Sequence, residues 1–332
     1  MLCQRNIRVT PCRSQGFPYQ ETATRRDLMP AMVTSIDRPR RAARRAPSPE
    51  ATRTAKQNLP PRRIAPRPET NRIITGDCLE VMGTWSDGCI DHCIVDPPFN
   101  IGSGSGRKSK SGLGWAFSSH VTMQETWDAF TKDEFFAFNV DWLREVARVV
   151  RPNGNILVFG TYHNIYQLGF ILQHVLERRV LNSVVWFKPN AQPNITARTL
   201  TESTEQIIWA VNETPAKATG WTFNYWDAKA MNGGKQMRNV WEFPVTPKKE
   251  RTNGAHPSQK PLAVVERLVL VGSAPGDLLL DPFGGAGTLA VAAQHHGRRW
   301  ALIESVPAYA ELARKRLQGE KRSAAAASRA SK

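Results

Sequence analysis

Short apolar runs alternate with helical patterns along most of this chain, from Asn71 to about residue 318. Apolar runs bounded by Gly, Pro, Asn or Asp are typical of strands, whereas apolar positions three and four residues apart, as at Phe135, Phe138 and Trp142, are typical of helices. Strands are expected over 72–75, 90–95, 155–160, 180–187, 205–211, 277–280 and 299–304. Helices are expected over 79–82, 133–150, 162–176, 261–271, 287–295 and 308–317. Seven strands that alternate with helices predict an α/β fold, with a mostly parallel sheet covered by helices on both faces.

The two ends of the chain differ in charge from the middle. Residues 1–70 hold 15 basic and 5 acidic residues, and residues 314–332 hold 7 and 1, so the ends account for the net charge of +16. Residues 71–313 hold 23 of each sign and are neutral as a whole. This basic surplus favours a polyanionic partner.

The composition predicts three parts: a disordered basic arm rich in Pro and Arg (1–70), a folded domain (71–318) and a disordered basic tail (319–332). For the arm, a gene start assigned too early and a targeting segment are the alternatives to disorder. Met29 and Met32 are in-frame candidates for a later start.

The five cysteines, at positions 3, 12, 78, 89 and 93, have no spacing typical of a metal site, so no metal is expected. Their odd number without a disulfide framework is typical of a reducing compartment. No apolar stretch approaches the roughly 20 residues that a membrane-spanning helix needs.

One candidate catalytic motif is Asp96-Pro97-Pro98-Phe99, which directly follows the expected strand 90–95. Open α/β sheets bind ligands at the carboxyl ends of their strands, so the position favours a site. A carboxylate, two prolines and an aromatic ring make a rigid pocket that is rich in oxygen and has one flat wall. Such a pocket suits the exocyclic amino group of a planar base.

A second motif, Asp281-Pro282-Phe283-Gly284-Gly285-Ala286-Gly287-Thr288, lies between a strand and a helix. Its glycines permit a tight turn and a close approach of a ligand to the backbone, and Glu304 ends the next strand, where an acid can bind ribose hydroxyls. The spacing is not that of a dinucleotide fingerprint, and Asp281 would repel a pyrophosphate. S-adenosylmethionine, with its sulfonium and ammonium, suits the motif better; a tight turn without any ligand is the alternative.

Together these motifs resemble the amino-group DNA methyltransferases of bacterial restriction–modification systems, in the subgroup whose catalytic motif precedes the cofactor motif. Residues 96–99 match D-P-P-Y/F, residues 283–288 match F-x-G-x-G-T, and residues 256–261 match H-P-[ST]-Q-K-P. The resemblance covers about residues 71–318. It implies the Rossmann-like fold of S-adenosylmethionine-dependent methyltransferases, with a seven-stranded sheet in the order 3-2-1-4-5-7-6 and strand 7 antiparallel.

The resemblance also implies site residues. Catalysis would fall to Asp96, Pro97, Pro98 and Phe99, with Phe in place of the commoner Tyr. The cofactor would contact Asp77, Cys78, Ser258, Lys260, Asp281, Phe283, Gly284, Gly285, Gly287, Thr288 and Glu304. In this assignment Asp77 and Cys78 lie beside the adenine, Glu304 holds the ribose, and Ser258 and Lys260 lie near the carboxylate of the cofactor.

Asp at the first position of the catalytic motif usually accompanies adenine N6 in this family, whereas Ser accompanies cytosine N4. Asp96 and the Pro97 carbonyl would each accept one N–H of the amine and aim its lone pair at the methyl group. The base would first flip out of the duplex and stack on Phe99.

The insert at 212–255 would recognise the target sequence, because it combines cations with aromatic residues. Its candidate DNA-binding residues are Lys229, Lys235, Arg238, Lys248, Lys249 and Arg251.

We therefore expect a site-specific adenine-N6 methyltransferase acting on double-stranded DNA. A cytosine-N4 enzyme, an RNA methyltransferase and an inactive DNA-binding module are the alternatives; a protein-amide methyltransferase fits Asp96 and the insert less well. A cognate restriction endonuclease and a homodimer are possible partners. The resemblance places the protein in the bacterial cytoplasm, associated with the nucleoid through DNA.

Overall fold

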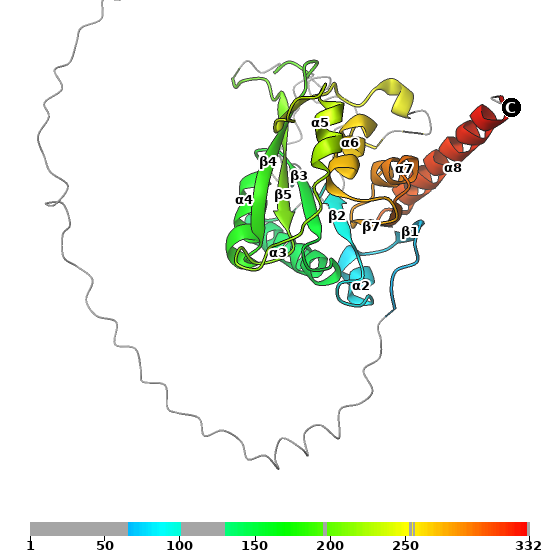
Figure 1. Ribbon diagram of the computed structural model, residues 1–332. Helices are drawn as coiled ribbons and strands as arrows, with labels where there is room; N and C mark the ends of the chain where they lie inside the picture. The colour runs from blue at the N-terminus through cyan, green and yellow to red at the C-terminus, as the bar shows by residue number, and fades with distance from the viewer. Residues whose placement is uncertain (1–65, 101–129, 195–197, 252–253, 255, 331–332) are drawn as a thin grey trace, which may run out of the picture. The chain divides into compact units, whose positions relative to one another are not determined.

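One sheet forms the centre of the molecule. The computed structural model describes residues 66–100, 130–194, 198–251, 254 and 256–330 (Figure 1). Within these residues, eight strands pair in the order β1-β8-β7-β2-β3-β5-β4-β6. The strands are β1 (Arg72–Thr75), β2 (His92–Val95), β3 (Asn155–Gly160), β4 (Arg179–Phe187), β5 (Thr204–Val211), β6 (Val240–Glu242), β7 (Leu278–Asp281) and β8 (Arg299–Glu304). Neighbouring strands are parallel except at β5, which is antiparallel to both β3 and β4.

The first seven strands in this order confirm the expected topology, and β5 takes the place of the antiparallel strand. The expected count of seven is wrong by one strand, because β6 adds to the edge of the sheet beside β4. Its three residues are too few to show an alternating pattern in the sequence. Only the middle one, Trp241, is buried, and Arg267 lies 5.3 Å from the centre of its ring.

Helices cover both faces of the sheet, as the alternation of patterns predicts. They are α2 (Cys78–Gly83), α3 (Lys132–Val149), α4 (Ile165–Phe170) with the π-helical turn η3 (Ile171–Val175), α5 (Tyr225–Met231), the 3₁₀ turn η4 (Lys248–Arg251), α6 (Leu262–Gly272), α7 (Thr288–His295) and α8 (Pro307–Ala330). The side chains of each strand alternate between two cores. Cys93 and Val95 pack with α2, α3 and α4, whereas Ile94 packs with α6 and α7.

The C-terminal helix is longer than the sequence pattern predicts. A disordered tail is expected over 319–332, but α8 continues to Ala330. Residues 324–327 are four consecutive alanines, which favour helix strongly but carry no amphipathic stripe. None of the described helices is long and apolar enough to span a membrane. Most of the expected N-terminal arm (1–65) and residues 101–129 lie outside the described part of the chain.

The sheet order explains how the two motifs meet. β2 lies directly beside β7, and β7 beside β8, with all three strands parallel. Their carboxyl ends therefore point to the same edge, although β2 and β7 are far apart in the sequence. The acidic residues that follow or end these strands are thereby brought to one place.

Candidate functional site

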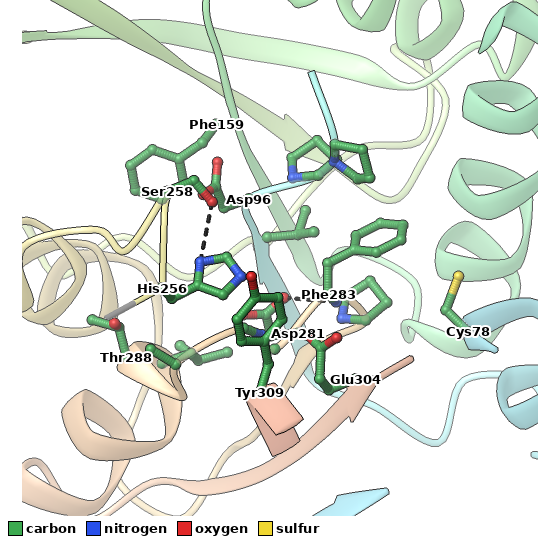
Figure 2. Close-up of a pocket in the computed structure, with 18 of the residues that line it drawn as sticks. Cys78, Asp96, Phe159, His256, Ser258, Asp281, Phe283, Thr288, Glu304 and Tyr309 are labelled. Atoms are coloured by element: carbon green, nitrogen blue, oxygen red, sulfur yellow. Dashed lines mark hydrogen bonds between the residues drawn. The ribbon is translucent and has the colours of Figure 1, made fainter. Parts of the chain in front are cut away.

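Four acidic residues surround one cavity at the carboxyl ends of the parallel strands. Asp77 follows β1, Asp96 follows β2, Asp281 ends β7 and Glu304 ends β8. The cavity has a volume of about 210 Å³. Figure 2 shows Asp96 on one side of it and Glu304 on the opposite side, with Asp281 between them.

The structure brings nearly all of the residues predicted for catalysis and cofactor binding to this cavity. Its lining includes Asp77, Cys78, Asp96, Pro97, Pro98, Phe99, Ser258, Lys260, Asp281, Phe283, Gly284, Gly285, Thr288 and Glu304. Gly287 is the exception. It has a φ of +75°, and a Cβ there would lie 3.0 Å from the Cβ of Ala313 in α8. Gly287 therefore allows α7 to begin close to α8, and it does not line the cavity.

The glycine-rich loop is fixed tightly against β8. The amide of Gly284 donates to the carbonyl of Ile303 (2.7 Å), and the amide of Gly285 donates to Oε2 of Glu304 (2.7 Å). Gly285 has a φ of +49°, and a Cβ on it would lie 3.3 Å from the ring of His256. Backbone therefore forms this wall of the cavity, which leaves room for a ligand to lie against it.

The charges of the cavity favour a cationic ligand. Burial raises the pKa of Asp281 well above its usual range, and the nearby carboxylates of Asp96 and Glu304 raise it further. A hydrogen bond from the amide of Phe283 to Asp281 Oδ1 (3.0 Å) opposes these effects. A cation bound here would stabilise the ionised form of Asp281. The residues present therefore fit a nucleoside cofactor that carries positive charge, such as S-adenosylmethionine.

The carboxylate of Asp96 is part of a chain of buried charges. Oδ2 of Asp96 lies 2.6 Å from Nζ of Lys260, which lies 3.3 Å from Oε2 of Glu205. Oε1 of Glu205 in turn lies 3.4 Å from Nζ of Lys188. Each of these four side chains is at most 17% exposed. The family resemblance implies that Lys260 lies beside the carboxylate of the cofactor; in the structure it lines the cavity, and its ammonium pairs with Asp96 and Glu205.

Burial raises the pKa of Asp96 to about 6, because the ammonium of Lys260 only partly offsets the loss of solvation and Glu205 raises the pKa further. Burial acts to lower the pKa of Lys260, but the two carboxylates outweigh it and raise that pKa. Oδ1 of Asp96 is buried and has no hydrogen-bond partner among the residues that the structure describes. An unpaired buried acceptor in a cavity is costly unless a ligand completes it.

The loop after Asp96 is held at several points. The side-chain amide of Asn164, at the start of α4, donates to the carbonyl of Pro98 (3.4 Å). Asn100 has a φ of +57°, and its side chain makes two hydrogen bonds with the backbone of Phe130 (3.0 and 3.2 Å). The ring of Phe99 is buried, with Nζ of Lys260 4.9 Å from its centre. One face of this ring therefore meets a cation.

Several residues at or beside the site are missing from the residues predicted from the sequence. Tyr309 of α8 packs against the ring of His256 (4.3 Å between ring centres), and both line the cavity (Figure 2). His256 belongs to the H-P-[ST]-Q-K-P motif and could have been found from it. Glu205 lies in a plain strand pattern, so its position beside Lys260 cannot be inferred without the pairing of β5 with β3.

Buried Arg316 joins α8 to the glycine-rich loop. It donates to Oγ1 of Thr288 (2.9 Å) and to the carbonyl of Ala286 (3.3 Å). Thr288 is thus held by a structural contact, although it also lines the cavity.

The predicted recognition insert (212–255) is divided between two ends of the sheet. The carbonyl of Thr222 accepts a hydrogen bond from Asn155, the first residue of β3 (2.8 Å), and Asn224 bonds to the carbonyl of Ser273 beyond the end of α6 (2.8 Å). This part therefore lies at the amino ends of the strands, away from the cavity. Trp226, which is 74% exposed, follows directly.

The candidate DNA-binding cations are divided in the same way. Nζ of Lys229 lies 5.4 Å from the centre of the Trp226 ring, on α5, which starts beside the end of α6. Lys248, Lys249 and Arg251 instead lie in η4, where Glu250 accepts a hydrogen bond from the first amide of α6. α6 begins two residues after Lys260, so η4 is on the side of the cavity.

Comparisons with known proteins agree with this geometry. Residues 90–315 match the family model N6_N4_Mtase, which is described as DNA methylase. The chain is 35% identical over 250 residues to the type II methyltransferase M2.DpnII of Streptococcus pneumoniae, covering 75% of this chain and 90% of that protein. It is 33% identical to the type II methyltransferase M2.MboI of Moraxella bovis, covering 74% and 86%.

Two solved structures also match this chain in fold. The complex of M1.HpyAVI with S-adenosylmethionine matches with a TM-score of 0.54 and 25% identity, covering 74% of this chain and 98% of that one. The cytosine-N4-specific PvuII DNA methyltransferase matches with a TM-score of 0.58 and 18% identity, covering 75% and 86%, which is a likeness of fold alone.

Proposed function

Because this chain belongs to the N6/N4 amino-group DNA methylase family and is an S-adenosylmethionine-dependent DNA methyltransferase of the restriction–modification type, we propose that its target is N6 of adenine in double-stranded DNA. The observation that supports this target is Asp96. Its Oδ1 is buried at the cavity without a partner among the described residues, so it is free to accept an N–H from an amino group. Asp at this position is also what the family pattern associates with adenine.

Different residues of the cavity would bind different parts of the cofactor. S-adenosylmethionine, when bound, supplies an electrophilic methyl group. Asp77 would contact its adenine, Glu304 its ribose hydroxyls, and Asp281 and Phe283 the part that carries the sulfonium. Asp77 also caps α2 by accepting from the amide of Leu79 (2.8 Å), so its position is fixed before any ligand binds.

Asp96 and the carbonyl of Pro97 would each accept a hydrogen bond from one N–H of the target amine. The amine is a poor nucleophile because its lone pair is delocalised into the ring. Two acceptors on one side pull it towards tetrahedral geometry, and a carboxylate stabilises the positive charge that develops on nitrogen. Alignment of the reacting groups supplies a further part of the rate.

Adenine must leave the base stack to reach this cavity, at a cost of a few kcal/mol. Phe99 would stack on the extruded base, which recovers about 1–3 kcal/mol. Since Lys260 lies against one face of this ring, the base would use the other face.

DNA would lie across the face of the molecule that carries the cavity. Lys248, Lys249 and Arg251 in η4 lie on that side, and Lys235 and Arg238 are exposed on the chain that leads there. We assign these five residues to phosphate contacts, and Lys229, whose Nζ lies 5.4 Å from the centre of the Trp226 ring, remains a sixth candidate.

In the cell, the DNA of the bacterial nucleoid would be the substrate. A homodimer and a cognate restriction endonuclease remain part of the proposal, since the resemblance to restriction–modification methyltransferases favours both.

The test is transfer of a tritiated methyl group to duplex DNA and to RNA in parallel, followed by chromatography of the digested nucleosides. We expect label only in duplex DNA, as N6-methyladenine. Label as N4-methylcytosine would favour the second amino-group target, and label in RNA alone would refute the DNA substrate. Binding of DNA without any transfer would point to an inactive binding module.

A further inference from the structure

Cofactor binding does not explain the chain of buried charges that runs from Asp96 through Lys260 and Glu205 to Lys188. Lys260 lies with Asp96 on one side and Glu205 on the other, and its side chain is 7% exposed. An ammonium that is buried between two carboxylates is not available to bind the carboxylate of a cofactor. The geometry instead directs its charge at one oxygen of the catalytic carboxyl.

We propose that Lys260 is a positioning residue for methyl transfer: it binds Oδ2 of Asp96, keeps this carboxyl ionised, and leaves Oδ1 to accept the N–H of the target amine. Glu205 and Lys188 hold Lys260 in place from behind. This inference rests on the proposed function, because it assigns Oδ1 to the amine.

The two oxygens of Asp96 differ as the proposal requires. Oδ2 has an ammonium at 2.6 Å, whereas Oδ1 is buried and has no partner within the described residues. A carboxyl that is buried without a cation becomes protonated, and a protonated carboxyl would present a donor where the amine needs an acceptor. Lys260 therefore decides both the charge of Asp96 and which oxygen is free.

The position of Lys260 is itself determined by its neighbours. It comes from the loop before α6, whereas Glu205 is the second residue of β5 and Lys188 directly follows β4. Nζ of Lys260 also lies 4.9 and 5.6 Å from the ring centres of Phe99 and Phe159. Rings and carboxylates thus surround the ammonium, which restricts the long side chain to one arrangement.

The charged groups around Asp96 shift its pKa in opposite directions. Lys260 lowers the pKa of Asp96, whereas Glu205 raises it. Asp281 and Glu304 lie further along the cavity, and the charge of Asp96 raises the pKa of Asp281. Removal of Lys260 should therefore raise the pH at which Asp96 titrates, and removal of the charge on Glu205 should lower it. A general loss of structure would not produce opposite shifts.

The experiment follows the side-chain carboxyl carbon of Asp96 by ¹³C NMR in the full-length protein without DNA or cofactor, with the signal assigned through Asp96→Asn. We expect Lys260→Met to raise the titration midpoint by about 1–3 pH units, the range for an opposite charge at this distance. Lys260→Arg should restore most of the shift, and Glu205→Gln should move the midpoint down. The exposed Lys217→Met is the matched control and should leave it unchanged.

A second measurement is the pH profile of single-turnover methyl transfer. At pH 7, Lys260→Met should lose roughly twofold to a hundredfold in rate, because a rise of the midpoint from about 6 by 1–3 units lowers the ionised fraction by that factor, and the loss should shrink as the pH rises. A loss that is equal at every pH, or a midpoint of Asp96 that does not rise, would overturn the proposal.

The role of Lys260 can be decided even if Lys260→Met does not fold or the enzyme does not methylate DNA. Lys260→Met leaves two carboxylates facing each other, so it can fail to fold. In that case the double variant Lys260→Met/Glu205→Gln is compared with Glu205→Gln alone, and its midpoint for Asp96 should be the higher. The NMR titration needs no methyl transfer, so an enzyme that does not modify DNA would refute the proposed function while the titration still decides the role of Lys260.

Discussion

Replacement of Asp96 by Asn tests the catalytic assignment most directly, because it removes the charge and almost nothing else. Oδ1 is buried, so the carboxylate acts in a medium of low polarity, where a fixed acceptor for developing charge is worth most. Loss of one such group usually lowers a rate by about 10²–10³, or roughly 3–4 kcal/mol. With a pKa of about 6, Asp96 is almost fully ionised near pH 7.5, so the variant loses a negative charge that nearly every wild-type molecule carries. We therefore expect a loss of about 10²–10³ for Asp96→Asn and no detectable transfer for Asp96→Ala.

The fold should survive the substitution, since Lys260 keeps Glu205 as a partner at 3.3 Å. Single-turnover transfer of tritiated methyl to duplex DNA gives the rate, and calorimetry gives the affinity for S-adenosylmethionine, which should change only a few-fold. The exposed Asp141→Asn on α3 is the matched control, with wild-type rate and affinity expected. If Asp96→Asn transfers methyl at a rate within threefold of the wild type, the amine is not held by this carboxylate. If it loses cofactor affinity as strongly as rate, Asp96 serves binding rather than the chemical step.

Three further outcomes are expected. For the wild type, kcat/KM should fall about tenfold per pH unit below about pH 6, since Asp96 must be ionised and its pKa is about 6; a rate independent of pH between 5 and 7 would contradict this. Gly287→Ala should lower the free energy of unfolding by about 1–2 kcal/mol, or roughly 2–8 °C in Tm, because alanine at a φ of +75° is strained; an unchanged melting curve would show that the loop adapts. Lys248→Ala/Lys249→Ala should reduce the slope of log K for DNA against log salt by about 2, and a slope equal to that of the wild type would remove η4 from the DNA contacts.

The sequence is sufficient to predict the parts of the site that are local. Residues 96–99 and 281–288 each carry their chemistry in consecutive residues at the end of a strand, so the two motifs and the sheet that joins them can be inferred. The ion pair of Lys260 with Asp96 cannot, since the partners are 164 positions apart and meet only because the loop before α6 reaches the carboxyl end of β2. The assignment of Lys260 to the cofactor followed the motif around it, which carries no information about the partner of its ammonium.

The position of the insert and the length of the C-terminal helix are two other features that the sequence pattern does not predict. Trp221 to Trp226 look like a recognition surface because they are aromatic, but the backbone around Thr222 and Asn224 is fixed to the amino ends of the sheet. Their position depends on buried hydrogen bonds to Asn155 and to the end of α6, which composition does not reveal. In α8, the alanine run lacks periodicity although it favours helix.

The order of the strands also determines when during synthesis this molecule can become complete. β1 and β2 are made early, yet β8 and β7 lie between them. Until the last part of the chain leaves the ribosome, β1 therefore has no partner, and one edge of β2 presents unpaired backbone groups to water. Such long-range pairing slows folding, and a nascent chain with an open strand edge is prone to associate wrongly. The same arrangement means that no chain that ends before β8 can possess both halves of the cavity, so methylation can begin only after β7 and β8 have been made.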